Sequence, residues 1–356
     1  MSAMEEIGSD GPEAEVSGRS RTRAPVMSDV GRLAGVSHQT VSRVINGSPH
    51  VRPETRDRVL AAMEELGYRP NPVARALVTG RSRTLGVVSF DTTLYGPAST
   101  LFGIERAAHD AGYFIIVASL KALDRSSVSD AVERLRRQGV DGILVIAPHE
   151  EAGDALLHTH ADVPLVAVEA GPDDGPAVVA VDQVGGAMIA TEHLLELGHR
   201  TVHHISGPTN FKESRQRRQG WRAALEAAGA EVPEPLVGDW SPRAGYELGR
   251  QLNADPTVTA VFVANDQMAL GMLRATHEAG REVPGELSVV GFDDIPEAAY
   301  FLPPLTTVRQ DFIEMGRRSL RLLLDTIEAG PQTGDGSLVP PELIVRASTG
   351  PGAGRL

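Results

Sequence analysis

The sequence predicts an α/β protein with a small helical region at its N-terminus. Between residues 84 and 292, short apolar runs alternate with segments of helical periodicity, which is typical of parallel sheets joined by right-handed crossovers. The chain beyond residue 84 is long enough to favour two sheets over one. Residues 27–66 show helical periodicity alone, so we expect a separate all-helical region there.

The composition excludes several classes of protein. The 356 residues are 41% hydrophobic, which is enough for sizeable cores, and none is a cysteine. Disulfide scaffolds, thiolate metal sites, Fe–S clusters and cysteine nucleophiles are therefore excluded. No apolar run approaches the roughly 18 residues of a spanning helix, and the acidic N-terminus is unlike a signal peptide. We expect a soluble cytoplasmic protein.

The net charge of −13 is unevenly distributed. Residues 1–18 contain five acidic residues and no basic ones, whereas residues 19–84 contain twelve arginines and five acidic residues. The remainder is strongly acidic. A compact basic block on an acidic body is typical of a nucleic-acid-binding domain, although an ordinary solvated basic surface is the alternative.

The basic block predicts a helix-turn-helix. Apolar spacing places Met27, Val30, Leu33 and Ala34 on one face of a helix over 27–34. A turn follows at 35–37, where Ser37 can cap a second helix over 38–46 with Val41, Val44 and Ile45 inward. Its outward residues are His38, Gln39, Ser42, Arg43 and Asn46. Arg43 suits guanine and Gln39 suits adenine, although an ordinary polar helix face is the alternative.

Two more helices are expected before residue 84. The first runs over 53–66, beginning at Pro53 and ending before Gly67. The second is capped by Asn71 and lasts about two turns, too short to be stable alone. Its apolar side chains have no evident local core. Two such helices paired across a dimer could lie in the minor groove and insert Leu77 between base steps.

At this point the sequence resembles the LacI/GalR family of bacterial repressors. The similarity begins with GRLAGVSHQTVSRVINGSPHVRPETRDRVLAAMEELGYRPNPVARALVTGRSRTLGVV and continues through VANDQMALG, VVGFDD and PPLTTVRQDF, over about residues 25–348. The later segments resemble the lactose-responsive members most. The resemblance implies that DNA is contacted by His38, Gln39, Ser42, Arg43, Asn46, His50, Asn71, Ala74 and Leu77.

The resemblance also implies the domain organisation. After a disordered tail (1–24) we expect a helix-turn-helix headpiece (25–70), a hinge helix or linker (71–83) and a sugar-binding, dimerising core (84–350). The core would consist of two Rossmann-like subdomains of periplasmic-binding-protein type, with the chain crossing between them three times. The N-subdomain comprises about 84–180 plus 311–338, and the C-subdomain about 181–310 plus 339–350.

Two headpiece positions depart from the family pattern. Val26 stands where a threonine usually caps the first helix, and Gly31 replaces a usual alanine. A lost cap and a mid-helix glycine each cost about 1 kcal/mol, so we expect a less stable headpiece.

Nothing in the core predicts an enzyme. The dinucleotide fingerprint, the P-loop, HExxH and GxSxG are absent. His203 and His204 lie on a strand, where neighbouring side chains face opposite ways and cannot chelate one metal. We expect no cofactor and no metal.

Polar residues at predicted strand ends favour a sugar site instead. Asn265 and Asp266 follow one strand, Asp293 and Asp294 follow another, and Arg217 lies on a helix. Such residues can bind hydroxyl groups at the carboxyl ends of parallel strands, and Trp240 or Phe312 could cover an apolar sugar face. For Asp266 and Asp294 we favour helix capping over sugar binding.

The family pattern extends this site. It implies an effector contacted by Leu94, Gly96, Pro97, Glu150, Phe211, Glu213, Arg217, Trp240, Asn265, Asp293, Gln310 and Phe312. Phe211 and Glu213 stand where two serines are usual, and Glu213 precedes Arg217 by four residues, the favourable order for an ion pair. These two departures leave the exact sugar open, and we expect a β-galactoside such as lactose first and a β-glucoside second.

Together these expectations describe a homodimeric repressor of a carbohydrate operon in the bacterial nucleoid. It would bind pseudo-palindromic DNA and be released by a sugar. The chain stops soon after Ser348 without apolar heptads, so a dimer is expected rather than a tetramer. The alternatives are a corepressed, purine-type regulator and a stand-alone sugar-binding protein.

Overall fold

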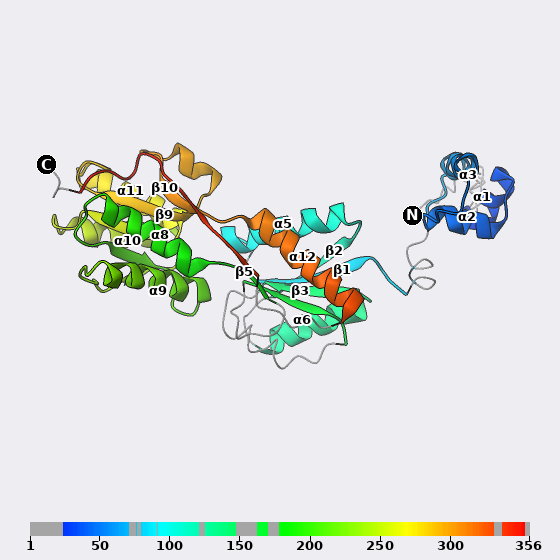
Figure 1. Cartoon of the computed structure of the whole chain (residues 1–356), viewed down its shortest axis with the longest axis horizontal. Coiled ribbons are helices and arrows are strands. Elements are labelled where there is room, and N and C mark those ends of the chain that lie inside the picture. The colour runs from blue at the N-terminus through cyan, green and yellow to red at the C-terminus, as the bar shows by residue number, and fades with distance from the viewer. Residues whose placement is uncertain are drawn as a thin grey trace, which may run out of the picture. The chain divides into compact units, whose positions relative to one another are not determined.

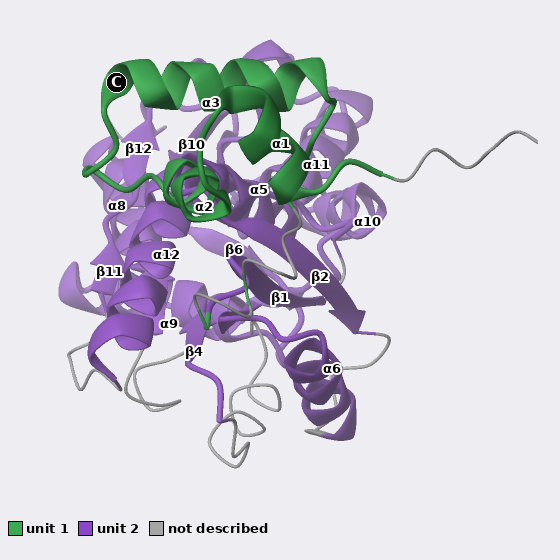
Figure 2. Ribbon diagram, turned by 90° about the vertical axis from the view of Figure 1, so that its right-hand side faces the viewer, with its two compact units in different colours: residues 1–80 green, residues 81–356 purple. Residues whose placement is uncertain are grey.

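The computed structural model describes residues 24–70, 76, 80–90, 92–120, 125–146, 162–169, 178–330 and 337–352. The chain divides into two compact units, residues 1–80 and 81–356, which Figure 2 shows in different colours. The predicted fold class is confirmed: a helical N-terminal unit precedes an α/β unit built on two largely parallel sheets.

Three helices form the first unit in its described part: α1 (Met27–Ala34), α2 (His38–Ile45) and α3 (Pro53–Glu65). Val30, Val41, Val44 and Val59 make its small core. Gly35, at φ 66°, allows the tight turn between α1 and α2. Ser37 then caps α2, accepting a hydrogen bond from the Thr40 amide at 3.2 Å.

The sequence prediction for Leu33 is wrong. Its side chain is 45% exposed, whereas Val30, Gly31 and Ala34 are the buried residues of α1. The buried stripe is therefore centred near Ala34, and Leu33 lies about 100° away around the helix. Leu33 therefore contributes little to the core of this unit.

The two unusual headpiece positions differ in their effect. Val26 is the N-cap of α1 and has no side-chain acceptor, although Asp29 accepts a hydrogen bond from its amide at 3.0 Å. Gly31 is buried, and a Cβ atom there would lie 2.9 Å from the Val36 carbonyl oxygen. An alanine would therefore require the turn after α1 to shift. The glycine lowers helix propensity, but it also allows this close approach of the turn to the helix.

The second unit contains two lobes, each built on one sheet (Figure 1). Among the described residues, the first sheet has the strand order β11-β5-β4-β3-β1-β2 and is parallel throughout. Its strands are β1 (Thr84–Phe90), β2 (Phe114–Leu120), β3 (Gly142–Ile146), β4 (Leu165–Val168), β5 (Val178–Val181) and β11 (Ser337–Val339). The helices of this lobe are α5 (Tyr95–Asp110), α6 (Arg125–Arg137) and α12 (Phe312–Ala329).

The second sheet, again in the described part of the chain, has the order β12-β10-β9-β8-β6-β7, and only the β10–β12 pair is antiparallel. Its strands are β6 (His203–Ser206), β7 (Leu236–Val237), β8 (Ala260–Val263), β9 (Ser288–Asp293), β10 (Thr306–Arg309) and β12 (Glu342–Ile344). Its helices are α8 (Gln183–Glu196), α9 (Lys212–Ala227), α10 (Pro242–Asn253), α11 (Asp266–Glu278) and the 3-10 helix η2 (Pro296–Tyr300).

Helix α10 is an element that our sequence analysis did not predict. Its signals are nevertheless present, because Ser241 caps it, accepting from the Ala244 amide at 3.1 Å, and Pro242 occupies its first position.

The chain crosses between the lobes three times, as the resemblance implies (Figure 1). The crossings run from β5 to α8 at Asp182, from β10 to α12 through Gln310 and Asp311, and from β11 to β12 through Pro340 and Pro341. None of the helices in the described ranges combines the length and apolar character that a bilayer crossing needs.

Candidate functional site

The outer face of α2 carries the predicted DNA contacts of the first unit. His38, Gln39, Arg43 and Asn46 are exposed and Ser42 is partly exposed, while Val41 and Val44 are buried on the opposite face. His50 is exposed in the following loop, and Arg56 donates to the Ser48 carbonyl of that loop at 2.9 Å. The remaining predicted contacts, Asn71, Ala74 and Leu77, lie outside the residues whose placement the structure describes.

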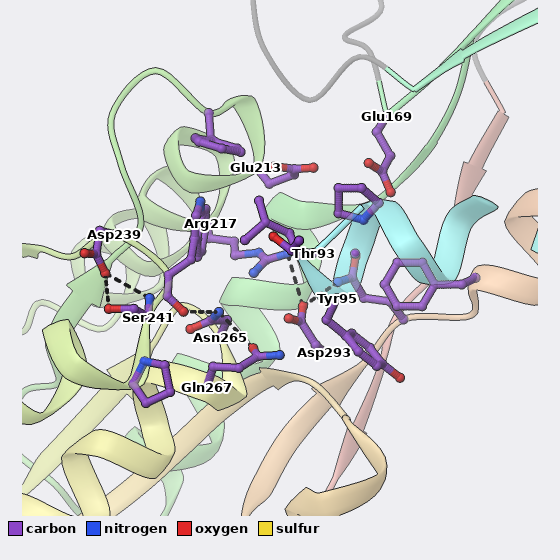
Figure 3. A pocket seen from close by; sticks show the side chains of 18 residues that line it. Thr93, Tyr95, Glu169, Glu213, Arg217, Asp239, Ser241, Asn265, Gln267 and Asp293 are labelled. Atoms are coloured by element: carbon purple, nitrogen blue, oxygen red, sulfur yellow. Dashed lines mark hydrogen bonds and ion pairs between the residues drawn. The ribbon is translucent and has the colours of Figure 1, made fainter. Parts of the chain in front are cut away.

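A pocket of about 270 Å³ lies in the second unit, between its two lobes (Figure 3). This volume is near the lower end of the range of about 300–1,000 Å³ for small-molecule sites. The residues that line it come from the carboxyl ends of strands and the first turns of the helices that follow: Thr93, Leu94, Tyr95, Gly96, Pro97, Glu169, Phe211, Glu213, Arg217, Asp239, Trp240, Ser241, Pro242, Asn265, Gln267, Asp293, Gln310 and Phe312.

The pocket brings together eleven of the twelve effector residues expected from the sequence. The twelfth, Glu150, falls outside the described residues. The lining residues that the sequence analysis missed include Glu169 and Gln267. Glu169 directly follows β4, so the strand-end argument that selected Asn265 and Asp293 applies to it equally.

Four buried side chains at the pocket form a closed ring of interactions. Arg217 Nε donates to Gln183 Oε1 at 2.8 Å, and Gln183 Nε2 donates to Gln310 Oε1 at 2.8 Å. Gln310 Nε2 then donates to Asp293 Oδ1 at 2.7 Å, and the same carboxylate oxygen lies 3.5 Å from Arg217 Nη2. Gln183 adjoins the crossing at Asp182, and Gln310 lies in the crossing that leads to α12. The ring therefore connects the pocket to these two crossings.

The charges of the ring are held away from water. Arg217 and Asp293 are 4% and 7% exposed, and the guanidinium lies 3.8 Å above the centre of the Phe292 ring. Burial raises the pKa of Asp293 to about 6, while Arg217 and the hydrogen bond from Gln310 oppose that rise. Arg217 also donates to the carbonyl of Ala264, the residue after β8.

The predicted Glu213–Arg217 ion pair is not formed. Within the described residues, the guanidinium binds Asp293, Gln183 and the Ala264 carbonyl instead. Burial and the nearby Glu169 carboxyl raise the pKa of Glu213 to about 8. The positive charge of Arg217 lowers this pKa, but by less than the other two effects raise it.

The capping roles expected for Asp266 and Asp294 are also wrong. Asn265 is the N-cap of α11, accepting from the Met268 amide at 3.0 Å. Asp266 is fully buried and joins separate segments, accepting from Thr307 Oγ1 at 2.6 Å and from the Ile295 amide at 2.9 Å. Asp294 pairs with Arg309 at 2.7 Å and Arg346 at 2.6 Å.

Two aromatic pairs form apolar walls of the pocket. Trp240 meets Phe211 edge to face at 5.5 Å between ring centres, and Tyr95 meets Phe312 in the same way at 5.8 Å. The Trp240 indole is fixed against Gly207, where any Cβ atom would overlap its ring. Its Nε1–H is buried and has no hydrogen-bond partner within the described segments.

Backbone strain is concentrated at the pocket. Glu169, Trp240 and Asp293 have φ angles of 62°, 72° and 109°, in the region that non-glycine residues rarely occupy. Strain of this kind persists where the surrounding structure holds it and is found most often at ligand sites. The pocket thus combines buried polar groups, aromatic walls and a constrained backbone, as a site for a small polar ligand does.

The comparisons with known proteins agree with both parts of this architecture. Residues 26–71 match the family described as bacterial regulatory proteins, lacI family, and residues 191–349 match a periplasmic binding protein-like domain. The lactose operon repressor of Escherichia coli K12 is 35% identical over 90% of this chain and 89% of its own length. The transcriptional regulator CelR of Thermobifida fusca is 38% identical over 86% of this chain and 93% of its own. The transcriptional repressor PurR of Haemophilus influenzae strain KW20 is 34% identical over 90% and 97%.

Solved structures give the same result. The Lac repressor dimer bound to operator and the anti-inducer ONPF has a TM-score of 0.82 at 33% identity, covering 92% of this chain and all of that one. A complex of the regulator CelR with cellobiose has a TM-score of 0.66 at 34% identity, covering 91% and 99%.

These features define a DNA-binding transcriptional regulator with a ligand-binding core. The chain belongs to the LacI family of bacterial transcriptional repressors.

Proposed function

We propose that this protein is a homodimeric repressor of carbohydrate genes that binds a pseudo-palindromic operator and is released from it by a saccharide. The observation that carries the saccharide assignment is the pocket, where the buried Arg217–Asp293 pair adjoins the Trp240 and Phe211 rings. Arginine and carboxylate groups each bind pairs of neighbouring hydroxyls, and aromatic faces cover the apolar side of a sugar ring.

DNA binding is assigned to the exposed face of α2. Gln39 and Arg43 are the residues suited to base edges, and Asn46 and His50, which are also exposed, are assigned to phosphate contacts. The relatives support this role, because a structure of the similar Lac repressor dimer contains operator DNA. Asn71, Ala74 and Leu77 complete the proposed interface as minor-groove contacts.

Effector and DNA would oppose each other through the core. A saccharide that favours one arrangement of the two lobes also changes the affinity for operator, and the coupling acts equally in both directions. The ring of Arg217, Gln183, Gln310 and Asp293 provides a direct connection from the pocket to two of the crossings.

Titration of the full-length protein onto an operator fragment tests the proposal. Operator affinity is measured by fluorescence anisotropy alone and with lactose, cellobiose and hypoxanthine. We expect one of the disaccharides to weaken operator binding about 10- to 100-fold, the usual size of such coupling. Tighter operator binding with any of these ligands would assign the protein to the corepressed class, and a lack of effect by every saccharide would overturn the sugar assignment.

A further inference from the structure

The pocket contains two carboxyl groups that the ring of Arg217, Gln183, Gln310 and Asp293 does not use. Glu169 follows β4 in one lobe, and Glu213 lies in the first turn of α9 in the other. Figure 3 shows both on the same side of the pocket. They are thus contributed by separate lobes to one region of the site.

Glu169 is only half satisfied by the protein. It is 7% exposed, and its Oε1 accepts a hydrogen bond from Thr100 Oγ1 at 2.7 Å. Among the described residues, its buried Oε2 has no hydrogen-bond partner. A buried acceptor without a donor is costly and rare in proteins, which points to a ligand that supplies the missing donor.

No lysine or arginine of the described segments forms an ion pair with either of these two groups. Arg217 is the one basic residue that lines the pocket in the described part of the chain, and its guanidinium already binds Asp293. Burial raises the pKa of both carboxyls, that of Glu213 to about 8. The charge of Glu169 raises the pKa of Glu213 further, whereas the adjacent Glu213 carboxyl lowers that of Glu169. Without a ligand the two groups therefore retain a proton at neutral pH.

We propose that Glu169 and Glu213 form a subsite for a protonated amino group, so that the effector is an amino sugar. The inference rests on the proposed saccharide-responsive function and specifies the class of saccharide. An ammonium group supplies a positive charge and three donors to a region that has two carboxyls and an unused acceptor. A sugar hydroxyl supplies one donor and no charge, and an N-acetyl group adds bulk without charge.

Calorimetric titration of the full-length protein with matched ligands tests this proposal. We compare the β-1,4-linked glucosamine disaccharide with cellobiose and with N,N′-diacetylchitobiose, which share the linkage and differ at position 2. At pH 6.5 we expect the amine to bind about 30- to 100-fold more tightly than the other two, the difference between two charged contacts and two neutral ones. Repeating the titration in phosphate and in Tris measures proton release, because the ammonium displaces the retained proton and a neutral sugar does not.

Variants locate the effect. Glu169→Gln and Glu213→Gln should each lower amine affinity about tenfold or more and reduce proton release, so that the preference for the amine over cellobiose falls. Glu226→Gln is the matched control, since Glu226 is an exposed residue of α9 that pairs with Arg222 away from the pocket. Thermal unfolding of each variant checks that the fold is kept.

The outcomes separate the two proposals. Equal binding of the three disaccharides, or tighter binding of cellobiose, would overturn the amino-sugar assignment and leave the saccharide-responsive repressor in place. A normal preference for the amine in both glutamine variants would overturn the assignment of the subsite. Absence of any saccharide binding, together with unchanged operator affinity, would overturn the proposed function itself.

Discussion

The substitution Asp293→Asn separates effector recognition from the general stability of the core. Asp293 and its neighbour Asp294 are equally buried, each with a side chain 8% exposed, and each pairs with arginine. Asp293 faces the pocket, whereas Asp294 pairs with Arg309 and Arg346 and does not line it. Asp294→Asn is therefore a matched control for the loss of a buried carboxylate.

The expected magnitudes follow from these contacts. Removing one partner of a buried ion pair lowers the free energy of unfolding by about 3–5 kcal/mol. We expect Asp293→Asn to lie near the lower value, because the asparagine oxygen can still accept the hydrogen bond from Gln310. Loss of a charged hydrogen bond to the effector costs about 1.5–3 kcal/mol, or roughly 10- to 100-fold in affinity. Asp294→Asn should destabilise the core by a similar amount without that loss of affinity.

Three measurements on each variant test this reasoning. Urea unfolding gives the stability, calorimetry gives the effector affinity, and anisotropy gives the operator affinity without effector. We expect both variants to be destabilised, only Asp293→Asn to lose effector affinity, and neither to change operator affinity by more than about twofold. The reasoning fails if Asp294→Asn loses effector affinity as strongly as Asp293→Asn.

Three further predictions concern other parts of the chain. Arg43→Ala should cost about 1–3 kcal/mol of operator binding and relax the preference for the operator sequence. The control Arg32→Ala, which lies outside α2, should have a smaller effect. Fluorescence anisotropy with operator DNA and with scrambled DNA measures both variants. Val26→Thr should stabilise α1 by about 1 kcal/mol by restoring a side-chain cap, seen as slower hydrogen exchange of the α1 amides; unchanged exchange would contradict this. Burial lowers the pKa of His204 to about 4, below its usual 6.5, so unfolding takes up a proton and stability falls as the pH decreases from about 6.5 towards 4. His204→Phe should reduce this pH dependence by about one proton in urea unfolding at several pH values, and an identical profile would refute it.

The sequence predicts the exposed face of α2 and part of the pocket from simple rules. The face of α2 follows from the spacing of Val41 and Val44, and Asn265 and Asp293 follow from the carboxyl ends of strands. Other lining residues, such as Leu94 and Gln310, were implied by the family resemblance. Glu169, which directly follows β4, satisfies the same strand-end rule.

The contacts between distant segments could not be predicted in this way. Gln183 and Gln310 are 127 positions apart, and their hydrogen bond depends on how two crossings meet in space. The Glu213 prediction was wrong for a related reason. Helical spacing places Arg217 within reach of Glu213. The guanidinium instead binds Asp293, which lies at the end of β9.

The hydrogen bonds in the ring of Arg217, Gln183, Gln310 and Asp293 all run in one direction, from Arg217 through the two glutamines to Asp293. Its guanidinium can only donate and its carboxylate can only accept, so both glutamine amides must have their oxygens towards Arg217 and their nitrogens towards Asp293. Turning either amide over would break two hydrogen bonds at once. We therefore expect a ligand that draws Arg217 or Asp293 towards itself to disturb both glutamines together, so that the two adjoining crossings respond as a pair rather than separately.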